Sequence, residues 1–205
     1  MKMTNRRNRI IYRLWAPFYD AILTRFFQPG RARAIEVLDP RAGERVLLVG
    51  VGTGADLPLL PAGVQAVGID LSAAMLARAK ARLPLPDRDI VLEEADAQAL
   101  PYDAGSFDAV VLNLILSVVP DPAACLREAL RVLRPGGRAV VFDKFVADGT
   151  RPTLGRRIGN LVTTPFGTNI IRRLGDILAG QECSVLSDES SLLGGLFRVV
   201  RLRRD

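Results

Sequence analysis

Alternating glycines followed by a carboxylate are the residues with the clearest chemical potential. Gly50, Gly52 and Gly54 end the stretch VLLVGVGTG (residues 46–54), directly after an apolar run. Glycines at such a turn expose backbone N–H groups and put no Cβ in the way of a ligand. Asp70 follows the next apolar run, where its carboxylate can accept hydrogen bonds from both hydroxyls of a ribose. The pattern predicts a site for a nucleotide-like ligand.

The glycine pattern alone leaves two ligands open. GVGTGA (residues 50–55) also satisfies the looser dinucleotide fingerprint G-x-G-x-x-A, and dehydrogenases carry an acid in the place of Asp70 as well. Later features do not fit a dehydrogenase. They are Asp96 in EEADAQALP (residues 93–101), SFDAVVL (residues 106–112) and LRPGG (residues 133–137).

The chain contains no histidine, which limits its chemistry. Histidine is the commonest general base and metal ligand, and every Ser-His or Cys-His nucleophile pair needs it. Cys125 and Cys183 are far apart and show no metal-ligand spacing, so we expect reduced thiols. The sequence therefore predicts no metal centre.

Apolar strand-like runs alternate with helix-period segments through the middle of the chain and must position these residues. Strands separated by helices imply right-handed crossovers and a parallel sheet covered on both faces. Two more strands joined across Gly194 and Gly195 predict an antiparallel C-terminal hairpin over 184–203. The expected fold is α/β, a doubly wound, mostly parallel seven-stranded sheet with a helical lid. We expect strands at 45–50, 64–69, 90–94, 107–113 and 138–144, and helices from 55, from 72 with Ser72 as N-cap, and over 122–133.

At 205 residues the chain fits one domain, 1–205, with a cofactor-binding core at 43–145. The longest apolar run is about half as long as a membrane-spanning helix requires. The first residues lack the features of a cleaved secretory signal, so we expect a cytoplasmic protein.

Two basic amphipathic segments flank this core. Residues 1–35 place apolar positions 11, 14, 15, 18, 22 and 26 on one helical stripe among arginines, and 145–180 repeats the composition. We expect a helical lid from the first segment and a helical substrate cap from the second. With a net charge of +6, both favour an anionic partner.

Taken together, the glycine loop, the two carboxylates and the LRPGG stretch strongly resemble the class I S-adenosylmethionine-dependent methyltransferases over about 43–145. Within that class the chain resembles the small quinone-ring and phospholipid methyltransferases. The resemblance implies S-adenosyl-L-methionine as cofactor. It also implies that the cofactor contacts Gly50, Val51, Gly52, Thr53, Gly54, Asp70, Leu71, Met75, Asp96, Ala97, Asn113 and Leu114.

The resemblance also assigns parts of the cofactor to these residues. The glycines would line its methionine part, Asp70 would bind the ribose, and Leu71 and Met75 would pack on the adenine. Asp96 would accept from the adenine amino group, and Asn113 would lie below the sulfonium. One position departs from the family: Leu48 replaces an acidic residue that helps to organise the amino end of the cofactor. We expect Tyr19, Asp20 or a backbone carbonyl to take over that task.

Methyl transfer is chemically possible without histidine, because the protein mainly aligns donor and acceptor and excludes water. Only an acceptor that starts protonated, such as an ammonium, needs a base. We expect Tyr19, in a Tyr-Asp pair at the end of the lid stripe, to orient the acceptor or accept its proton.

The acceptor is best argued from the two flanking segments. YDAILTRFFQPGR (residues 19–31) is similar to the lid of bacterial phosphatidylethanolamine N-methyltransferases, and basic helices with aromatic residues suit an anionic bilayer. We therefore expect a phospholipid acceptor, peripheral attachment to the inner membrane face and no nucleic-acid partner. The expected substrate-binding residues are Tyr12, Lys144, Arg156 and Arg172.

Two other functions stay open on the sequence. The acceptor could be a quinone precursor, a thiol or another small molecule, with the basic stripe forming a solvated lid face. The second open function is that of a regulatory or RNA-associated protein that binds the cofactor without turnover. The sequence leaves the number of methyl transfers and the oligomeric state open.

Overall fold

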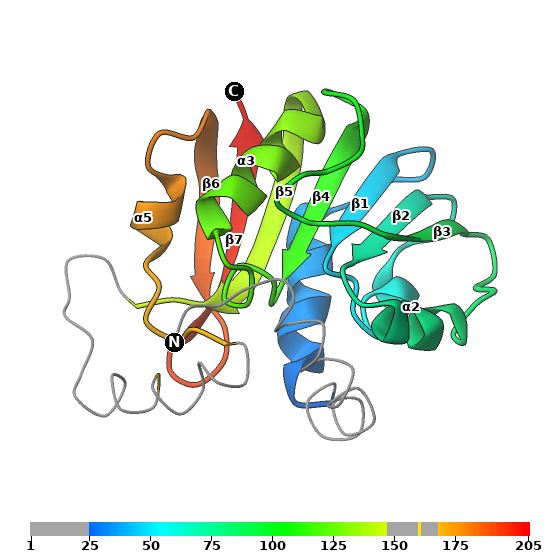
Figure 1. The fold of residues 1–205 in the computed structure, drawn as a ribbon, viewed down its shortest axis with the longest axis horizontal. Coiled ribbons are helices and arrows are strands. Elements are labelled where there is room, and N and C mark those ends of the chain that lie inside the picture. The colour runs from blue at the N-terminus through cyan, green and yellow to red at the C-terminus, as the bar shows by residue number, and fades with distance from the viewer. Residues whose placement is uncertain (1–24, 147–159, 161–167) are drawn as a thin grey trace.

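The computed structural model describes residues 25–146, 160 and 168–205, and a seven-stranded sheet forms its centre (Figure 1). The strand order is β3-β2-β1-β4-β5-β7-β6. The bounds are β1 Arg45–Val49, β2 Gln65–Asp70, β3 Asp89–Glu94, β4 Phe107–Asn113, β5 Leu133–Lys144, β6 Cys183–Ser190 and β7 Phe197–Arg204.

The first five strands are parallel and the last two are antiparallel, which confirms the expected fold class. β1 pairs in parallel with both β2 and β4, and β4 pairs in parallel with β5. β7 pairs antiparallel with both β5 and β6, so the last strand is inserted into the sheet instead of extending its edge. The order reverses between β1 and β4, which is where parallel α/β sheets bind ligands beyond the carboxyl ends of their strands.

Helices cover both faces of the sheet, which explains the continuous apolar runs of the central strands. α3 (Pro122–Val132) and α5 (Leu174–Leu178) pack on one face, against alternate residues of β1 and β4 such as Leu47 and Val110. The helix of residues 25–38 and α2 (Ala73–Lys80) pack on the other face, against Leu48 and Val111. Figure 1 shows α3 on one side of the sheet and the helix of residues 25–38, in blue, on the other.

Side chains at the helix starts fix where α2 and α3 begin. The Ser72 hydroxyl accepts from the Met75 N–H at 3.4 Å, which confirms the predicted N-cap of α2. Asp121 accepts from Ala124 N at 2.9 Å and is followed by Pro122, a residue suited to the first helical position.

The helix expected from residue 55 was wrong, because the structure has only the 3-10 turn η1 (Leu57–Leu59) there. Pro58 suits the first turn of a helix, but Pro61 forces the residue before it out of helical conformation. Leu60 accordingly is extended, with ψ 142°.

β5 begins five residues earlier than expected, at Leu133 instead of Arg138. Leu133 pairs with Phe107, and the pairing then shifts before it resumes at Ala109 and Arg138. Residues 134–137 form this irregularity, with Gly136 at φ +72°.

The helix of residues 25–38 lies very close to the sheet because residue 30 is glycine. A Cβ built at Gly30 would overlap the Phe142 ring, which is fully buried. Farther along the same helix, Arg33 makes a two-bond ion pair with Glu189 of β6, both bonds 2.9 Å long. These contacts fix the helix relative to the carboxyl end of the sheet.

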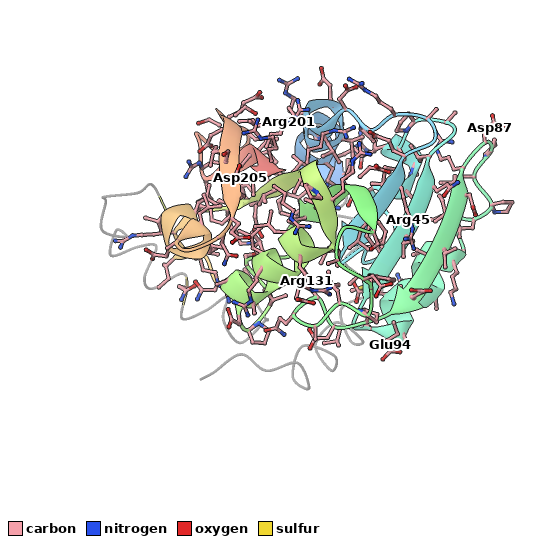
Figure 2. All side chains as sticks on the ribbon, turned by 90° about the horizontal axis from the view of Figure 1, so that it is seen from above. Arg45, Asp87, Glu94, Arg131, Arg201 and Asp205 are labelled. Atoms are coloured by element: carbon pink, nitrogen blue, oxygen red, sulfur yellow. The ribbon has the colours of Figure 1, made fainter. Side chains whose placement is uncertain are left out.

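On the opposite face, Arg131 of α3, labelled in Figure 2, fixes the connection that leads into β4. Its guanidinium donates to the carbonyls of Tyr102 at 2.8 Å and Leu100 at 3.0 Å, and it pairs with Glu128. The segment after Asp96 is thereby held against α3.

Candidate functional site

A pocket opens at the carboxyl ends of β1, β2 and β4, with about 860 Å³ of empty space, part of it open to solvent. The predicted cofactor residues line it, with the exception of Gly54. They come from five separate stretches that only the folded sheet brings together. The lining comprises Arg31, Gly50, Val51, Gly52, Thr53, Ala55, Ile69, Asp70, Leu71, Ser72, Met75, Ala95, Asp96, Ala97, Asn113, Leu114, Ile115, Val118, Val119 and Pro120.

The glycine loop needs its glycines for two different reasons. Gly50 has φ +72°, and a Cβ there would lie 2.5 Å from Cδ1 of Ile115, which also lines the pocket. Gly54 has φ +80° and lies against α2, where a Cβ would come within 3.0 Å of Cα of Ala79. Gly50 therefore allows close approach at the pocket, while Gly54 allows close packing of the helix.

Asp70 organises the loop as well as lining the pocket. Its Oδ2 accepts from Gly52 N at 2.9 Å, and its Oδ1 accepts from Ser72 N at 2.8 Å. Burial raises the pKa of Asp70 to about 6, against the opposing effect of these two backbone hydrogen bonds. Each carboxylate oxygen keeps a second lone pair, so the group can still accept from a ribose hydroxyl.

The predicted adenine end of the pocket is built from α2 and the turn after β3. Met75 and Ala97 are buried in the lining. Asp96 Oδ1 accepts from the backbone N and the side-chain Nε2 of Gln98, at 2.9 and 3.1 Å. Gln98 in turn accepts from Asp121 N at 2.9 Å, which connects this turn to the start of α3.

A buried polar chain forms one wall of the pocket. Arg31 donates to Asp56 Oδ2 at 2.7 Å, and Asn113 Nδ2 donates to Asp56 Oδ1 at 3.0 Å. Only 7%, 2% and 4% of Arg31, Asp56 and Asn113 are exposed, so both charges are paired out of contact with bulk water. The chain joins the helix of residues 25–38, the turn after the glycine loop and the end of β4.

Asn113 provides an internal test of whether a cofactor fits. Its Oδ1 is buried and has no hydrogen-bond partner within the described structure, although Asn113 lines the pocket. Buried polar atoms are nearly always satisfied, so an acceptor in this position suits a ligand with a donor group. The amino group of S-adenosylmethionine is such a donor, and the residues fit the cofactor.

Sequence reasoning missed Asp56 and the pocket position of Arg31. Asp56 lies two residues beyond the last glycine of the loop, and a carboxylate so close to a ligand-binding turn was the available signal. Leu48, which replaces the usual acid, is 1% exposed and packs in the core on the α2 side of the sheet. Asp56, which is 2% exposed, supplies a buried carboxylate beside Arg31 and Asn113 of the lining. Tyr19 and Asp20, which we expected to take over the role of the missing acid, lie outside the described residues.

Two of the expected substrate-binding residues lie beside the pocket and outside its lining. Lys144 Nζ donates to Ser117 Oγ at 3.0 Å and lies 5.6 Å from the centre of the Phe197 ring. Arg172 donates to the carbonyls of Leu116 and Val119, the latter at 2.6 Å. Tyr12, Tyr19 and Arg156 fall outside the described residues.

The described residues show neither a metal cluster nor a membrane span. Over 25–146, 160 and 168–205, no group of three or more cysteine, aspartate or glutamate side chains is placed to hold a metal ion. Within the same ranges, no helix has the length and apolar character needed to cross a bilayer.

A comparison with known proteins points to one enzyme class. A family described as "Methyltransferase domain" matches residues 47–141. The chain is 33% identical over 196 residues to a phosphatidylethanolamine N-methyltransferase of Cereibacter sphaeroides, covering 94% of this chain and 95% of that protein. It is 43% identical over 114 residues to a demethylmenaquinone methyltransferase of Beutenbergia cavernae, but this match covers 55% of this chain and 46% of that protein.

Solved structures agree on the fold. A S-adenosylmethionine-dependent methyltransferase from Thermotoga maritima, described as a possible histamine N-methyltransferase, superposes with a TM-score of 0.71. The superposition covers 97% of this chain and 100% of that one at 21% identity, so the likeness concerns the fold.

Proposed function

The chain belongs to the class I S-adenosylmethionine-dependent methyltransferases, and we propose that it N-methylates the headgroup of phosphatidylethanolamine at a membrane surface. The observation that carries the proposal is the extent of the match to the Cereibacter sphaeroides enzyme, which covers 94% of this chain. It must include most of the segments outside 43–145, where we expect the acceptor to be selected. The match to the demethylmenaquinone methyltransferase covers only 55% of the chain.

S-adenosylmethionine supplies an electrophilic methyl group when it is bound. The residues of the pocket hold and orient it: Asp70 and Asp96 are available to the adenosine part, and Asn113 Oδ1 to the amino end. The phosphatidylethanolamine amine must lose a proton before its lone pair can attack the methyl carbon. Bound S-adenosylmethionine would supply the methyl group to the deprotonated nitrogen and be left as a neutral thioether, and the one proton lost beforehand from the ammonium would go to a base or to water. We propose Tyr19 as the group that orients the amine or accepts its proton.

The charge of the chain supports an acceptor that carries a phosphate group and lies in an anionic membrane surface. The net charge is +6, and several of the arginines outside the core lie in 1–35 and 145–180. Arginine binds phosphate oxygens in pairs through its planar fork, so Arg156 is our candidate for the lipid phosphate. Tyr12 and Lys144 are our candidates for the rest of the headgroup.

The proposal is tested by incubating the purified chain with radiolabelled cofactor and vesicles of phosphatidylethanolamine. We expect label in mono- or dimethylated lipid, and none with vesicles of phosphatidylglycerol alone. Asn113→Ala is the matched inactive control, since it removes Oδ1, the hydrogen-bond acceptor proposed for the amino group of the cofactor. Mass spectrometry of lipid from a host without lipid methylation, expressing this chain, gives an independent measurement. If neither experiment yields methylated phosphatidylethanolamine, this lipid is ruled out as the methyl acceptor.

A quinone precursor is the second candidate, because the local identity to the demethylmenaquinone methyltransferase is higher, 43% over 114 residues. That match covers about the length of the cofactor-binding core. The same assay with demethylmenaquinone in detergent separates the two acceptors, since only one of them should take up label.

A further inference from the structure

The connection from β4 to α3, residues 114–120, forms one wall of the cofactor pocket. Leu114, Ile115, Val118, Val119 and Pro120 all line it. The segment consists of turns and has no regular helix or strand to stabilise it. Leu114 has φ +61°, a left-handed conformation that costs free energy in a non-glycine residue. Contacts from outside the wall must therefore maintain its shape.

Arg172 supplies the contacts on the outer side of this wall. Its Nη1 donates to the Leu116 carbonyl and its Nη2 to the Val119 carbonyl, so one guanidinium spans the turn. Asn169 N donates to the Ser117 carbonyl at 2.8 Å, between these two bonds. Three carbonyls of this turn, those of residues 116, 117 and 119, therefore accept hydrogen bonds from 168–173.

The end of β5 holds the same turn from a second direction. Asp143, which is fully buried, accepts from Ser117 N at 2.8 Å. Lys144 Nζ donates to Ser117 Oγ at 3.0 Å. Arg172 and these two residues meet around Ser117, and Val146 N donates to the Arg172 carbonyl at 2.8 Å.

Arg172 makes these bonds from a partly buried position. Burial lowers the pKa of the Arg172 guanidinium, while the nearby Asp143 and Asp121 carboxylates oppose that effect. A partly desolvated charge makes stronger hydrogen bonds to neutral acceptors than an uncharged donor does. The two carbonyls accept from two different nitrogens of the planar arginine fork, whereas the three N–H donors of a lysine ammonium all lie on one nitrogen.

We propose that Arg172 is a positioning residue of the cofactor pocket, which holds 114–120 in the conformation that lines the pocket. Arg172 lies outside the lining of the pocket and donates to the backbone of the wall at Leu116 and Val119. This role rests on the methyltransferase activity and is independent of the proposed phospholipid acceptor.

The first test measures cofactor affinity without turnover. Isothermal calorimetry with S-adenosylhomocysteine is performed on wild type, Arg172→Lys and Arg172→Met. We expect the dissociation constant to rise about tenfold in Arg172→Met and by a smaller factor in Arg172→Lys. Arg127→Met is the matched control, because Arg127 is an exposed arginine of α3 and should bind like wild type.

A second measurement separates positioning from general loss of stability. Hydrogen exchange at the amides of 115–119 should be faster in Arg172→Lys than in wild type, while the central strands keep their protection. Circular dichroism confirms that each variant is folded. If Arg172→Met does not fold, Arg172→Lys decides: wild-type affinity together with wild-type exchange would overturn the proposal.

Steady-state kinetics separate this role from direct binding of the acceptor. With any acceptor that the enzyme methylates, Arg172→Lys should raise the KM for the cofactor and leave the KM for the acceptor unchanged. A rise confined to the KM of the acceptor, with unchanged calorimetric affinity, would instead place Arg172 in the acceptor site. Failure on phosphatidylethanolamine alone would leave the calorimetric result intact.

Discussion

Single side chains in this site serve the protein and its ligand at the same time. Asp70 accepts from Gly52 N and Ser72 N while it lines the pocket, so one carboxylate fixes the glycine loop and offers itself to a ribose. Asn113 donates to Asp56 with its amide nitrogen. Its amide oxygen has no hydrogen-bond partner among the described residues. Changing either residue should therefore affect both the local structure and the binding of the ligand.

Cofactor binding should depend on pH through Asp70, whose pKa is raised to about 6. Because the folded pKa exceeds that of the unfolded chain, this group's stabilising effect is fully present below about pH 4 and is lost as pH rises through about 6. Ribose hydroxyls donate to the ionised form. We therefore expect the dissociation constant of S-adenosylhomocysteine to rise as pH falls below about 6, by up to tenfold per pH unit.

Asp70→Asn is the control for this pH dependence. The amide keeps the shape of the side chain but cannot ionise, so the affinity should be lower at neutral pH and nearly constant from about pH 5 to 7. Calorimetry over that range measures both. A wild-type slope that persists in Asp70→Asn would assign the titration to another group.

Asp56→Asn should destabilise the protein more than an ordinary polar substitution. Arg31 and Asp56 form a buried ion pair with 9% and 3% of their side chains exposed, and removing the charge of one partner leaves the other uncompensated. We expect the free energy of unfolding in urea to fall by about 3 kcal/mol. Glu189→Gln, which removes the charge of an exposed partner of Arg33, should change the free energy of unfolding in urea little. Equal effects of the two substitutions would contradict this explanation.

At the scale of elements, the site depends on how closely one helix approaches the sheet. Gly30 lets the helix of residues 25–38 pack over Phe142, and the next residue, Arg31, reaches Asp56 in the pocket wall. Arg33 and Glu189 fix the same helix to β6. Contacts at Gly30 and Arg33, before and after Arg31 in the sequence, thus set the position of this helix.

Gly30→Ala tests this packing, because the two physical effects have opposite signs. Helix propensity alone would stabilise the substitution by about 1 kcal/mol. Overlap of the new methyl with the buried Phe142 ring should instead destabilise the protein by about 1–3 kcal/mol, and should weaken cofactor binding through Arg31. Urea unfolding and calorimetry measure these effects. The double variant with Phe142→Leu should recover part of the lost stability, whereas a stabilised Gly30→Ala would show that the helix can move freely.

The strands and most of the pocket could be predicted because their signals are local. Apolar runs locate the five parallel strands, and the glycine loop, Asp70 and Asp96 each follow one of them. The polar chain of Arg31, Asp56 and Asn113 could not be predicted, because its members are 25 and 57 residues apart. The contact of Arg172 with the carbonyls of 116 and 119 could not be predicted either. Its partners are distant in the sequence, and a backbone carbonyl is present at every residue, so no residue type identifies it as an acceptor.

At the scale of the whole molecule, charge should govern attachment to membranes. The net charge of +6 is expected to draw the chain to anionic bilayers, and salt weakens such attraction by screening. We predict that the protein sediments with vesicles containing phosphatidylglycerol, and that the bound fraction falls steadily as sodium chloride is added. Vesicles of pure phosphatidylcholine are the control. Equal binding to both vesicle types at all salt concentrations would contradict an electrostatic attachment.

The insertion of β7 between β5 and β6 has a consequence for biosynthesis. Val199, Val200 and Leu202 are fully buried, and β7 supplies the hydrogen-bond partner for the whole outer side of β5 from Arg138 to Lys144. While residues 197–204 are still inside the ribosomal exit tunnel, that side of β5 is an unpaired strand edge that can pair with other chains. We expect the core to close only after residues 197–204 have left the exit tunnel, and chaperones that shield unpaired strands to matter most before then.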